Sequence, residues 1–279
     1  MIDLHIHTTA SDGLLSPREA VRYAGECGVD CVAITDHNVF LSRQEAAALS
    51  EEFGVNVIPG AEISSLYGQR EMHILAYGTL PEDSELAEAM RKTLQQRRER
   101  AVKIAAKLRE YGIFLNEEEL MACKGGVPGR MHIARQMVAQ GYCATTREAF
   151  ERYIGIGNPA YIPCQYLSAV QAVSLTRAAG LVPVLAHPMR YHAEQPKLFS
   201  IIRSLADAGL QGVEVYYPAH RAMEVRFLKR CCRRFGLTPT AGSDFHGRDH
   251  HWSRIGVPFS LSSEEERVMR AFVGGTGMQ

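Results

Sequence analysis

The chain has 279 residues, of which 46% are hydrophobic, enough to bury the core of one large α/β domain or two smaller ones. The 31 lysines and arginines balance 31 aspartates and glutamates, so overall charge does not recruit nucleic acid or an anionic membrane. The seven cysteines include no C-x-x-C pair, which argues against a disulfide framework. The N-terminus does not resemble a signal peptide, and no apolar run reaches the roughly 20 residues of a membrane-spanning helix, so we expect a cytoplasmic protein.

Short apolar or β-branched runs alternate with helical patterns along the chain. In order, seven strands are expected at residues 2–7, 30–37, 55–62, 72–78, 181–188, 212–217 and 238–246, with helices such as 17–27, 43–53, 169–179 and 219–235 between most of them. Ser16, Pro17 and Glu19 are typical of a helix start with a capping box. This alternation predicts a sheet of parallel βα units, and closure into a barrel is the economical arrangement.

One segment interrupts the alternation. Between the fourth and fifth expected strands, about a hundred residues show helical patterns and no convincing strand, far beyond an ordinary βα connection. We therefore expect a small helical domain at residues 81–163, here called the insert. It would interrupt a barrel made of residues 1–80 and 164–279.

Histidines and carboxylates gather where the expected strands end. They are His5, His7, Asp12, His37, Glu62, His73, His187, Asp244 and His246, with His73 lying inside the fourth strand. In a parallel α/β barrel the carboxyl ends of the strands meet at one mouth, so these side chains should converge. Imidazoles mixed with carboxylates, without thiolates, suit Zn²⁺, Mn²⁺ or Fe²⁺. The sequence thus predicts a metal centre.

The motifs H-x-H, D-G, T-D-H, G-x-E, H-P and D-x-H in this order resemble the PHP family, named for polymerase and histidinol phosphatase domains. The resemblance covers nearly the whole chain and implies a distorted seven-stranded β/α barrel with phosphoesterase activity. "GRMHIAR" and "AHPMRY" are similar to the 3′,5′-nucleotide bisphosphate phosphatases and related RNA 5′-to-3′ exonucleases of that family.

The resemblance also implies a ligand set for two or three divalent ions. His5, His7, Glu62 and Asp244 would hold the first ion; Glu62, His73 and His187 the second; and Asp12, His37 and His246 the third. Many histidinol phosphatases have histidine where this chain has Asp12. A bridging hydroxide would attack phosphorus, with Glu62, Asp244, His187 and His220 as catalytic residues. Asp36 could orient His37 or cap the following helix.

Substrate contacts are expected from the insert. The glycine-rich loop "GGVPG" leads into a helix with Arg130, His132 and Arg135, which could bind a second phosphate. The alternative is an ordinary amphipathic helix with solvated arginines. His220 could contact substrate at the rim, and His192 has a weaker claim.

The basic run at residues 91–109 is expected to be a helix with a solvated charged face, and no aromatic residue interleaves to stack bases. We therefore expect RNA ends only as a possible substrate, and no obligate protein partner. The predicted activity is removal of the 3′-phosphate from a nucleoside 3′,5′-bisphosphate. The alternatives are a 5′-to-3′ exonuclease on short RNA, a cyclic-phosphate diesterase, a histidinol phosphatase and a non-catalytic PHP module. The insert argues against a histidinol phosphatase. A non-catalytic module would be expected to have lost metal ligands, and this chain has a suitable residue at all nine positions.

Overall fold

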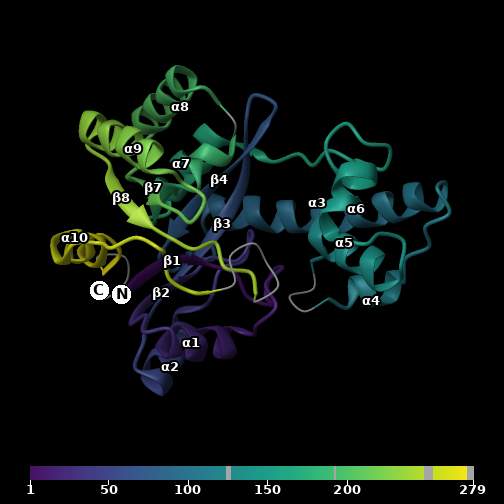
Figure 1. Cartoon of the computed structure of the whole chain (residues 1–279), viewed down its shortest axis with the longest axis horizontal. Helices are drawn as coiled ribbons and strands as arrows, with labels where there is room; N and C mark the ends of the chain where they lie inside the picture. Colours follow the sequence, from purple (N-terminus) through teal and green to yellow (C-terminus); the bar gives the residue numbers. More distant parts are fainter. Residues whose placement is uncertain (124–126, 192, 248–253, 275–279) are drawn as a thin grey trace.

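One curved sheet occupies the centre of the computed structural model, which describes residues 1–123, 127–191, 193–247 and 254–274 (Figure 1). The strands are β1 (Ile2–Ile6), β2 (Cys31–Ile34), β3 (Asn56–Tyr67), β4 (Arg70–Tyr77), β5 (Leu167–Ser168), β6 (Val182–Leu185), β7 (Gly212–Tyr216) and β8 (Thr238–Ala241). Seven of them follow the order β1-β2-β3-β4-β6-β7-β8, and short β5 pairs with β3.

The sheet closes into a barrel through the segment that follows β8. The backbone N–H of Asp244 donates to the carbonyl of His5 at 2.8 Å, and the N–H of His7 donates to the carbonyl of Phe245 at 2.8 Å. These bonds join the first strand to the last at the carboxyl end. The expected distorted seven-stranded barrel is confirmed, with β5 as a short addition.

The prediction of an all-parallel sheet is wrong for one strand. β4 runs antiparallel to both β3 and β6, because β3 and β4 form a hairpin with only residues 68 and 69 between them. The hairpin extends beyond β2, whose last residue Ile34 pairs with Pro59 while β3 continues to Tyr67. Because β4 enters from the mouth, His73 near its beginning lies level with the carboxyl ends of the parallel strands.

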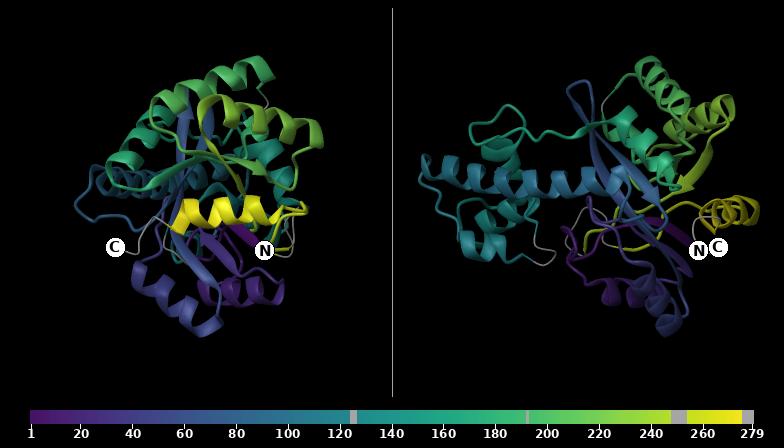
Figure 2. Two further views of the ribbon diagram at one scale, coloured as in Figure 1. Left: turned by 90° about the vertical axis from the view of Figure 1, so that its left-hand side faces the viewer. Right: turned by 180° about the vertical axis from the view of Figure 1, so that it is seen from behind.

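Helices cover the outside of the barrel and also build the insert beside it (Figures 1 and 2). They are α1 (Pro17–Glu26), α2 (Arg43–Phe53), α3 (Glu85–Arg109), α4 (Glu117–Met121), α5 (Arg130–Ala139), α6 (Thr146–Ala149), α7 (Ala169–Ala178), α8 (Gln195–Asp207), α9 (Ala222–Phe235) and α10 (Ser263–Gly274), with a π-helical turn η1 (Phe150–Ile154) and a 3-10 turn η2 (Pro188–Tyr191). The predicted capping box of Ser16 and Glu19 opens α1. Helix α9 begins later than residue 219, because Arg221 is its extended N-cap.

Helix α3 connects the barrel to the insert (Figure 1). Leu86 and Met90, in its first turns, belong to the main core of the barrel. Ile104 and Leu108, further along, pack in a separate apolar cluster with residues of α4, α5 and η1. One continuous helix therefore fixes the helical segment beside the barrel mouth. The domain limits at residues 81 and 163 stay a prediction.

All seven cysteines are free thiols, as expected from their spacing. Among the described residues, no helix combines the length and apolar character needed to cross a membrane.

Candidate active site

Glu62, in the middle of β3, lies at the centre of the histidine cluster. Its Oε1 is 2.8 Å from Nδ1 of His73 and 2.9 Å from Nε2 of His187. Its Oε2 is 2.9 Å from Nδ1 of His37 and 3.3 Å from Nε2 of His7. One carboxylate thus meets imidazoles from four segments that are far apart in the sequence.

His5 of β1 and His7, the residue after this strand, point into the same cluster, on the side of Asp244. Their Nε2 atoms are 3.1 Å apart. Oδ1 of Asp244 lies 3.3 Å from Nε2 of His7 and 3.5 Å from Nε2 of His5. All three side chains are buried. Alternation along β1 places both imidazoles on the inner face, as the H-x-H pattern predicts.

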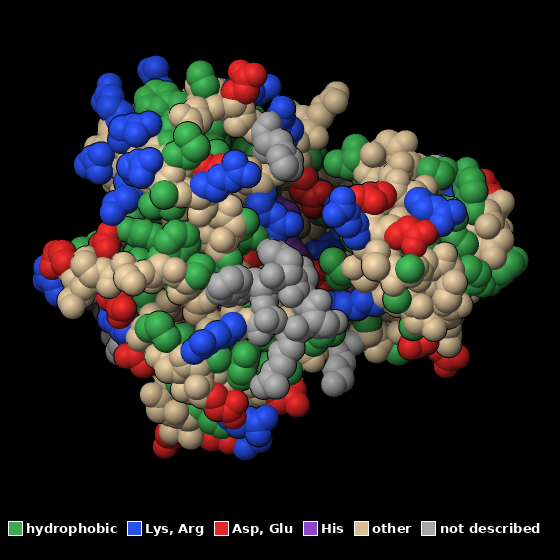
Figure 3. Space-filling view, in the orientation of Figure 1, with side chains coloured by type: hydrophobic (Ala, Val, Ile, Leu, Met, Phe, Trp, Pro, Cys, Tyr) green, Lys and Arg blue, Asp and Glu red, His purple; other side chains and the backbone are tan. Residues whose placement is uncertain are grey.

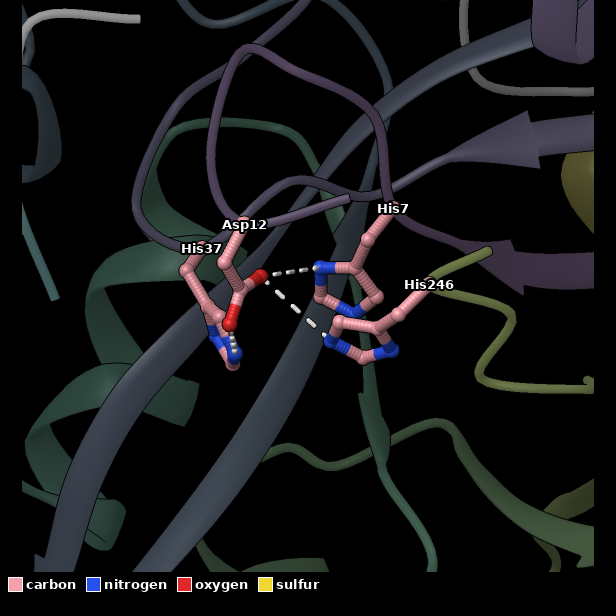
Figure 4. A group of neighbouring side chains, drawn as sticks. All are labelled: His7, Asp12, His37 and His246. Carbon is pink, nitrogen blue, oxygen red and sulfur yellow. Dashed lines mark ion pairs between the residues drawn. The ribbon is translucent and has the colours of Figure 1, made fainter. Parts of the chain in front are cut away.

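Asp12 forms a third group with histidines from three other segments (Figure 4). Its Oδ1 lies 3.4 Å from Nε2 of His246 and 3.7 Å from Nδ1 of His7, and its Oδ2 lies 3.9 Å from Nε2 of His37. The structure therefore brings all nine predicted ligands together at the mouth. Their roles as ligands stay a prediction.

Surrounding contacts orient the imidazoles. Nδ1 of His5 lies 3.0 Å from Oε1 of buried Glu214, so this nitrogen donates to the carboxylate and Nε2 faces the cluster. Nδ1 of His246 similarly lies 2.8 Å from the carbonyl oxygen of Asp244. Glu214 is not among the residues predicted from the sequence. A glutamate inside the apolar run "GVEVYY" does indicate a buried carboxylate, which could have identified it.

Asp36 orients the loop that carries Asp12. It accepts hydrogen bonds from the backbone N–H and the hydroxyl of Thr8 at 2.8 and 2.6 Å, and from the hydroxyl of Ser11 at 2.5 Å. The sequence had left open whether Asp36 orients His37 or caps the following helix. Its hydrogen bonds go to Thr8 and Ser11, and the N-cap of α2 is Ser42.

Backbone strain also marks the site. Of the three non-glycine residues with positive φ in the described part of the chain, two are candidate ligands: His187 (26°) and Asp244 (54°). Such conformations are costly and persist where the surrounding structure requires them. The backbone N–H of His187 donates to Oε2 of Glu214 at 2.7 Å, which helps to hold this conformation.

The cluster concentrates negative charge that needs compensation. Burial works against ionisation of Glu62, but the charges of His73, His37 and His5 hold its pKa well below its ordinary value. Burial likewise disfavours a charged His7, yet hydrogen bonds to Asp244 and Glu62 raise its pKa to about 10.

This donor set fits divalent metal ions. Three groups could each hold one: His5, His7, Glu62 and Asp244; His7, Asp12, His37 and His246; and His37, Glu62 and His73. Nδ1 of His37 and Oε2 of Glu62 are buried and form an ion pair at 2.9 Å, but the pair lacks the geometry of a hydrogen bond. Facing lone pairs of this kind are what a cation would satisfy.

A cavity of about 320 Å³ opens above the cluster, in the hollow between barrel and insert (Figure 3). Seven of the nine predicted ligands line it, all except His5 and His7. The opposite wall contains Arg97 and Arg100 of α3 and Arg130 of α5. Arg190, just after the "HP" motif, lies beside the cluster, with Nη1 2.9 Å from Oδ2 of Asp244.

Comparison with known proteins identifies this arrangement. A model described as the PHP domain matches residues 3–156, more than half of the chain. The chain belongs to the PHP domain family. The resemblance seen in the sequence motifs is thereby confirmed.

Relatives of this PHP protein cover nearly its whole length. It is 32% identical over 244 residues to a 5′-3′ exoribonuclease from Haemophilus influenzae (88% of this chain, 89% of the relative). It is 32% identical over 262 residues to a 3′,5′-nucleoside bisphosphate phosphatase from Chromobacterium violaceum (89% of this chain, 90% of the relative). A structure from Bifidobacterium adolescentis, assigned as a metal-dependent phosphoesterase, has a TM-score of 0.84 and 27% identity (97% of this chain, 96% of that one). The PHP protein is a metal-dependent phosphoesterase, which confirms the expected enzyme class.

Of the three insert residues predicted to bind substrate in this PHP protein, one lines the cavity and two do not. Nη2 of Arg130 pairs with Oε2 of Glu71 at 2.9 Å at the cavity wall. His132 accepts the N–H of Gly129 at 3.1 Å, and Nη1 of Arg135 donates to the carbonyl of Asp12 at 2.7 Å. Neither of these two lines the cavity.

His220 also lies outside the lining of the cavity. Its Nδ1 is 3.0 Å from the carbonyl oxygen of Val215, and its ring is 5.1 Å from that of Tyr217. His192 and part of the glycine-rich loop, residues 124–126, lie outside the described residues.

The basic run was only partly interpreted correctly. Residues 91–109 do lie on one helix, α3, as expected. Arg97 and Arg100, however, are on its buried face, because they follow Thr93 and precede Ile104 at helical spacing. The expectation that the charges of this run face solvent is wrong for these two residues, and they belong to the cavity.

Proposed function

We propose that this phosphoesterase removes the 3′-phosphate from nucleoside 3′,5′-bisphosphates. The observation that carries the proposal is that one cavity joins the histidine and carboxylate cluster to arginines at its opposite wall. A substrate with two phosphates can place one at each end. The volume of about 320 Å³ lies within the range of roughly 300–1,000 Å³ of small-molecule sites.

The barrel would hold the metal ions and the reacting phosphate. In this proposal His5, His7, Glu62 and Asp244 hold one ion, His73 and His187 complete a second site with Glu62, and Asp12, His37 and His246 form a third. Bound divalent ions would supply an activated water and stabilise negative charge on the phosphate oxygens. Manganese, zinc and iron all suit the mixture of nitrogen and oxygen donors.

Arg190 would stabilise the reacting phosphate from the protein side. Its side chain is 50% exposed and lines the cavity while contacting Asp244. The hydroxyl of Tyr217 lies 3.1 Å from Nη1 of Arg190 and 3.1 Å from Oδ2 of Asp244, which fixes this orientation. A fixed guanidinium beside the cluster can neutralise charge that develops on phosphate oxygens.

A second candidate function is 5′-to-3′ exonuclease activity on short RNA. It is favoured by the Haemophilus influenzae relative, which is as similar to this chain as the bisphosphate phosphatase. The same cluster could cleave a phosphodiester, with the arginine wall contacting the neighbouring phosphate.

Phosphate and nucleotide release from a substrate panel tests both candidates. With Mn²⁺ supplied, the panel holds nucleoside 3′,5′-bisphosphates, nucleoside 3′-monophosphates, cyclic phosphates, histidinol phosphate and short 5′-phosphorylated RNA. We expect the highest kcat/KM for the bisphosphate. Glu62→Gln protein purified alongside should show no phosphate release. A higher kcat/KM for RNA, with sequential release of mononucleotides, would favour the exonuclease.

A further inference from the structure

Arg97 differs from the other arginines of the cavity wall because its charge has no partner. Only 9% of the residue is exposed, and no hydrogen bond or ion pair joins its guanidinium to another group in the described part of the chain. Arg130 is paired with Glu71, and Nε of Arg100 donates to the carbonyl of Ile162 at 2.6 Å. Arg97 is therefore the wall cation that is free to bind a ligand.

A buried, unpaired guanidinium is unfavourable unless an anion compensates for it. The carboxylate of Glu71 cannot do so, since it already contacts Arg130 at 2.9 Å and Nε2 of His73 at 3.6 Å. The remaining carboxylates that line the cavity, Asp12, Glu62 and Asp244, belong to the cluster on the opposite side. No carboxylate among the described residues therefore compensates for Arg97, and a bound anion can do so.

The surroundings keep the Arg97 guanidinium close to the entrance of α5. A Cβ atom added to Gly129 would lie 2.7 Å from Nη2 of Arg97, so glycine permits this close approach. Arg100, one turn further along α3, is held by Ile162 and lies 3.4 Å from the hydroxyl of Tyr166. Two guanidinium groups and a tyrosine hydroxyl thus form a donor surface on the wall of the cavity.

We infer that Arg97 binds the substrate phosphate that is not hydrolysed and so determines the preference for bisphosphates over monophosphates. This inference rests on the proposed function. It assigns the second phosphate to α3 instead of to Arg130 and Arg135, which are engaged with Glu71 and with the backbone of Asp12. In the proposed reaction, the bound group is the 5′-phosphate of the nucleotide.

The test compares kcat/KM for a nucleoside 3′,5′-bisphosphate and for the matching nucleoside 3′-monophosphate in Arg97→Met protein. A charge-assisted contact predicts a loss of roughly ten- to a hundredfold for the bisphosphate, mostly in KM, and little change for the monophosphate. Arg97→Lys should recover part of the loss, since it keeps the charge without the planar fork. Arg98→Ala, on the exposed neighbouring position, is the matched control.

Two further measurements separate binding from folding. Because none of the described residues pairs with Arg97, Arg97→Met should leave the melting temperature unchanged or raise it. Gly129→Ala should displace the guanidinium and weaken bisphosphate turnover while the charge remains. Lower melting temperatures with equal losses on both substrates would show a structural role and overturn the inference.

Calorimetry with a nucleoside 5′-monophosphate on protein without added metal tests the same contact independently of turnover. We expect at least about tenfold weaker binding by Arg97→Met than by the wild type. Equal affinities would overturn the role of Arg97, even if the wild type hydrolyses bisphosphates as proposed. A wild type that binds the monophosphate through Arg97 but releases no phosphate from bisphosphates would contradict the proposed function and leave the binding site in place.

Discussion

Nη1 of Arg135 donates a hydrogen bond of 2.7 Å to the backbone carbonyl of Asp12, so a helix of the insert holds the loop that carries a candidate ligand. Asp36 holds the same loop from the barrel through Thr8 and Ser11. The position of Asp12 therefore depends on both parts of the molecule.

This contact predicts the behaviour of Arg135→Ala. Because Arg135 acts on Asp12 and does not line the cavity, the variant should slow bisphosphate and monophosphate hydrolysis by the same factor, on the order of tenfold. Steady-state kinetics with both substrates measures this. Arg147→Ala, at an insert arginine that is 85% exposed, is the control. A loss confined to the bisphosphate would instead place Arg135 at the second phosphate.

Glu62→Gln should have the largest effect on metal content and rate. Glutamine keeps the shape but lacks the charge that faces four imidazoles, so two proposed ion sites would weaken together. We expect at least about a hundredfold lower kcat. Elemental analysis and phosphate release check the two effects, with exposed Glu51→Gln as control. A metal-free wild-type protein with full activity would contradict the metal centre.

Asp12→Ala should affect one proposed ion and spare the others. Asp12 faces His7, His37 and His246, whereas Glu62 and Asp244 belong to the remaining groups. We expect fewer ions per chain with lower turnover. Titration of the metal-free protein with Mn²⁺ in a calorimeter measures how many ions each chain binds. Loss of every ion in this variant would show that the three groups are not separable.

The pair of Glu265 and Lys229 should make stability depend on pH. Burial opposes the charge of Glu265, but hydrogen bonds from Lys229 (2.8 Å) and Tyr216 lower its pKa to about 2. A carboxylate with a lowered pKa stabilises the folded state above its unfolded pKa of about 4.3, and this contribution is lost as pH falls toward 2.

Glu265→Gln should therefore lower the free energy of unfolding by about 1–2 kcal/mol at pH 7, after allowance for solvent screening. The difference from the wild type should shrink below about pH 4. Urea denaturation at several pH values measures it, and Glu51→Gln, at an exposed position, should show no change. A difference that is constant with pH would rule out the charged pair as its source.

Much of the barrel and of its mouth follows from local pattern. Alternation in "IDLHIH" places His5 and His7 on one face, and polar residues directly after apolar runs mark the strand ends, so sequence alone indicated all nine residues of the cluster. These features depend on the period of a strand and on its direction in a βα unit, which a short stretch of chain expresses by itself.

Only the tertiary structure decided which arginines face the cavity and which carboxylate supports the cluster. Arg97 and Arg98 are adjacent in one basic run, yet one is buried at the cavity and the other is exposed. From the sequence, Arg130 and Arg135 were expected to bind the second phosphate, but their charges are directed to Glu71 and to the carbonyl of Asp12. His73 reached the mouth because β4 runs antiparallel to its neighbours. A charged side chain takes its role from the groups that other segments place opposite it, and those groups are brought there by packing over distances of many residues, which no local period encodes.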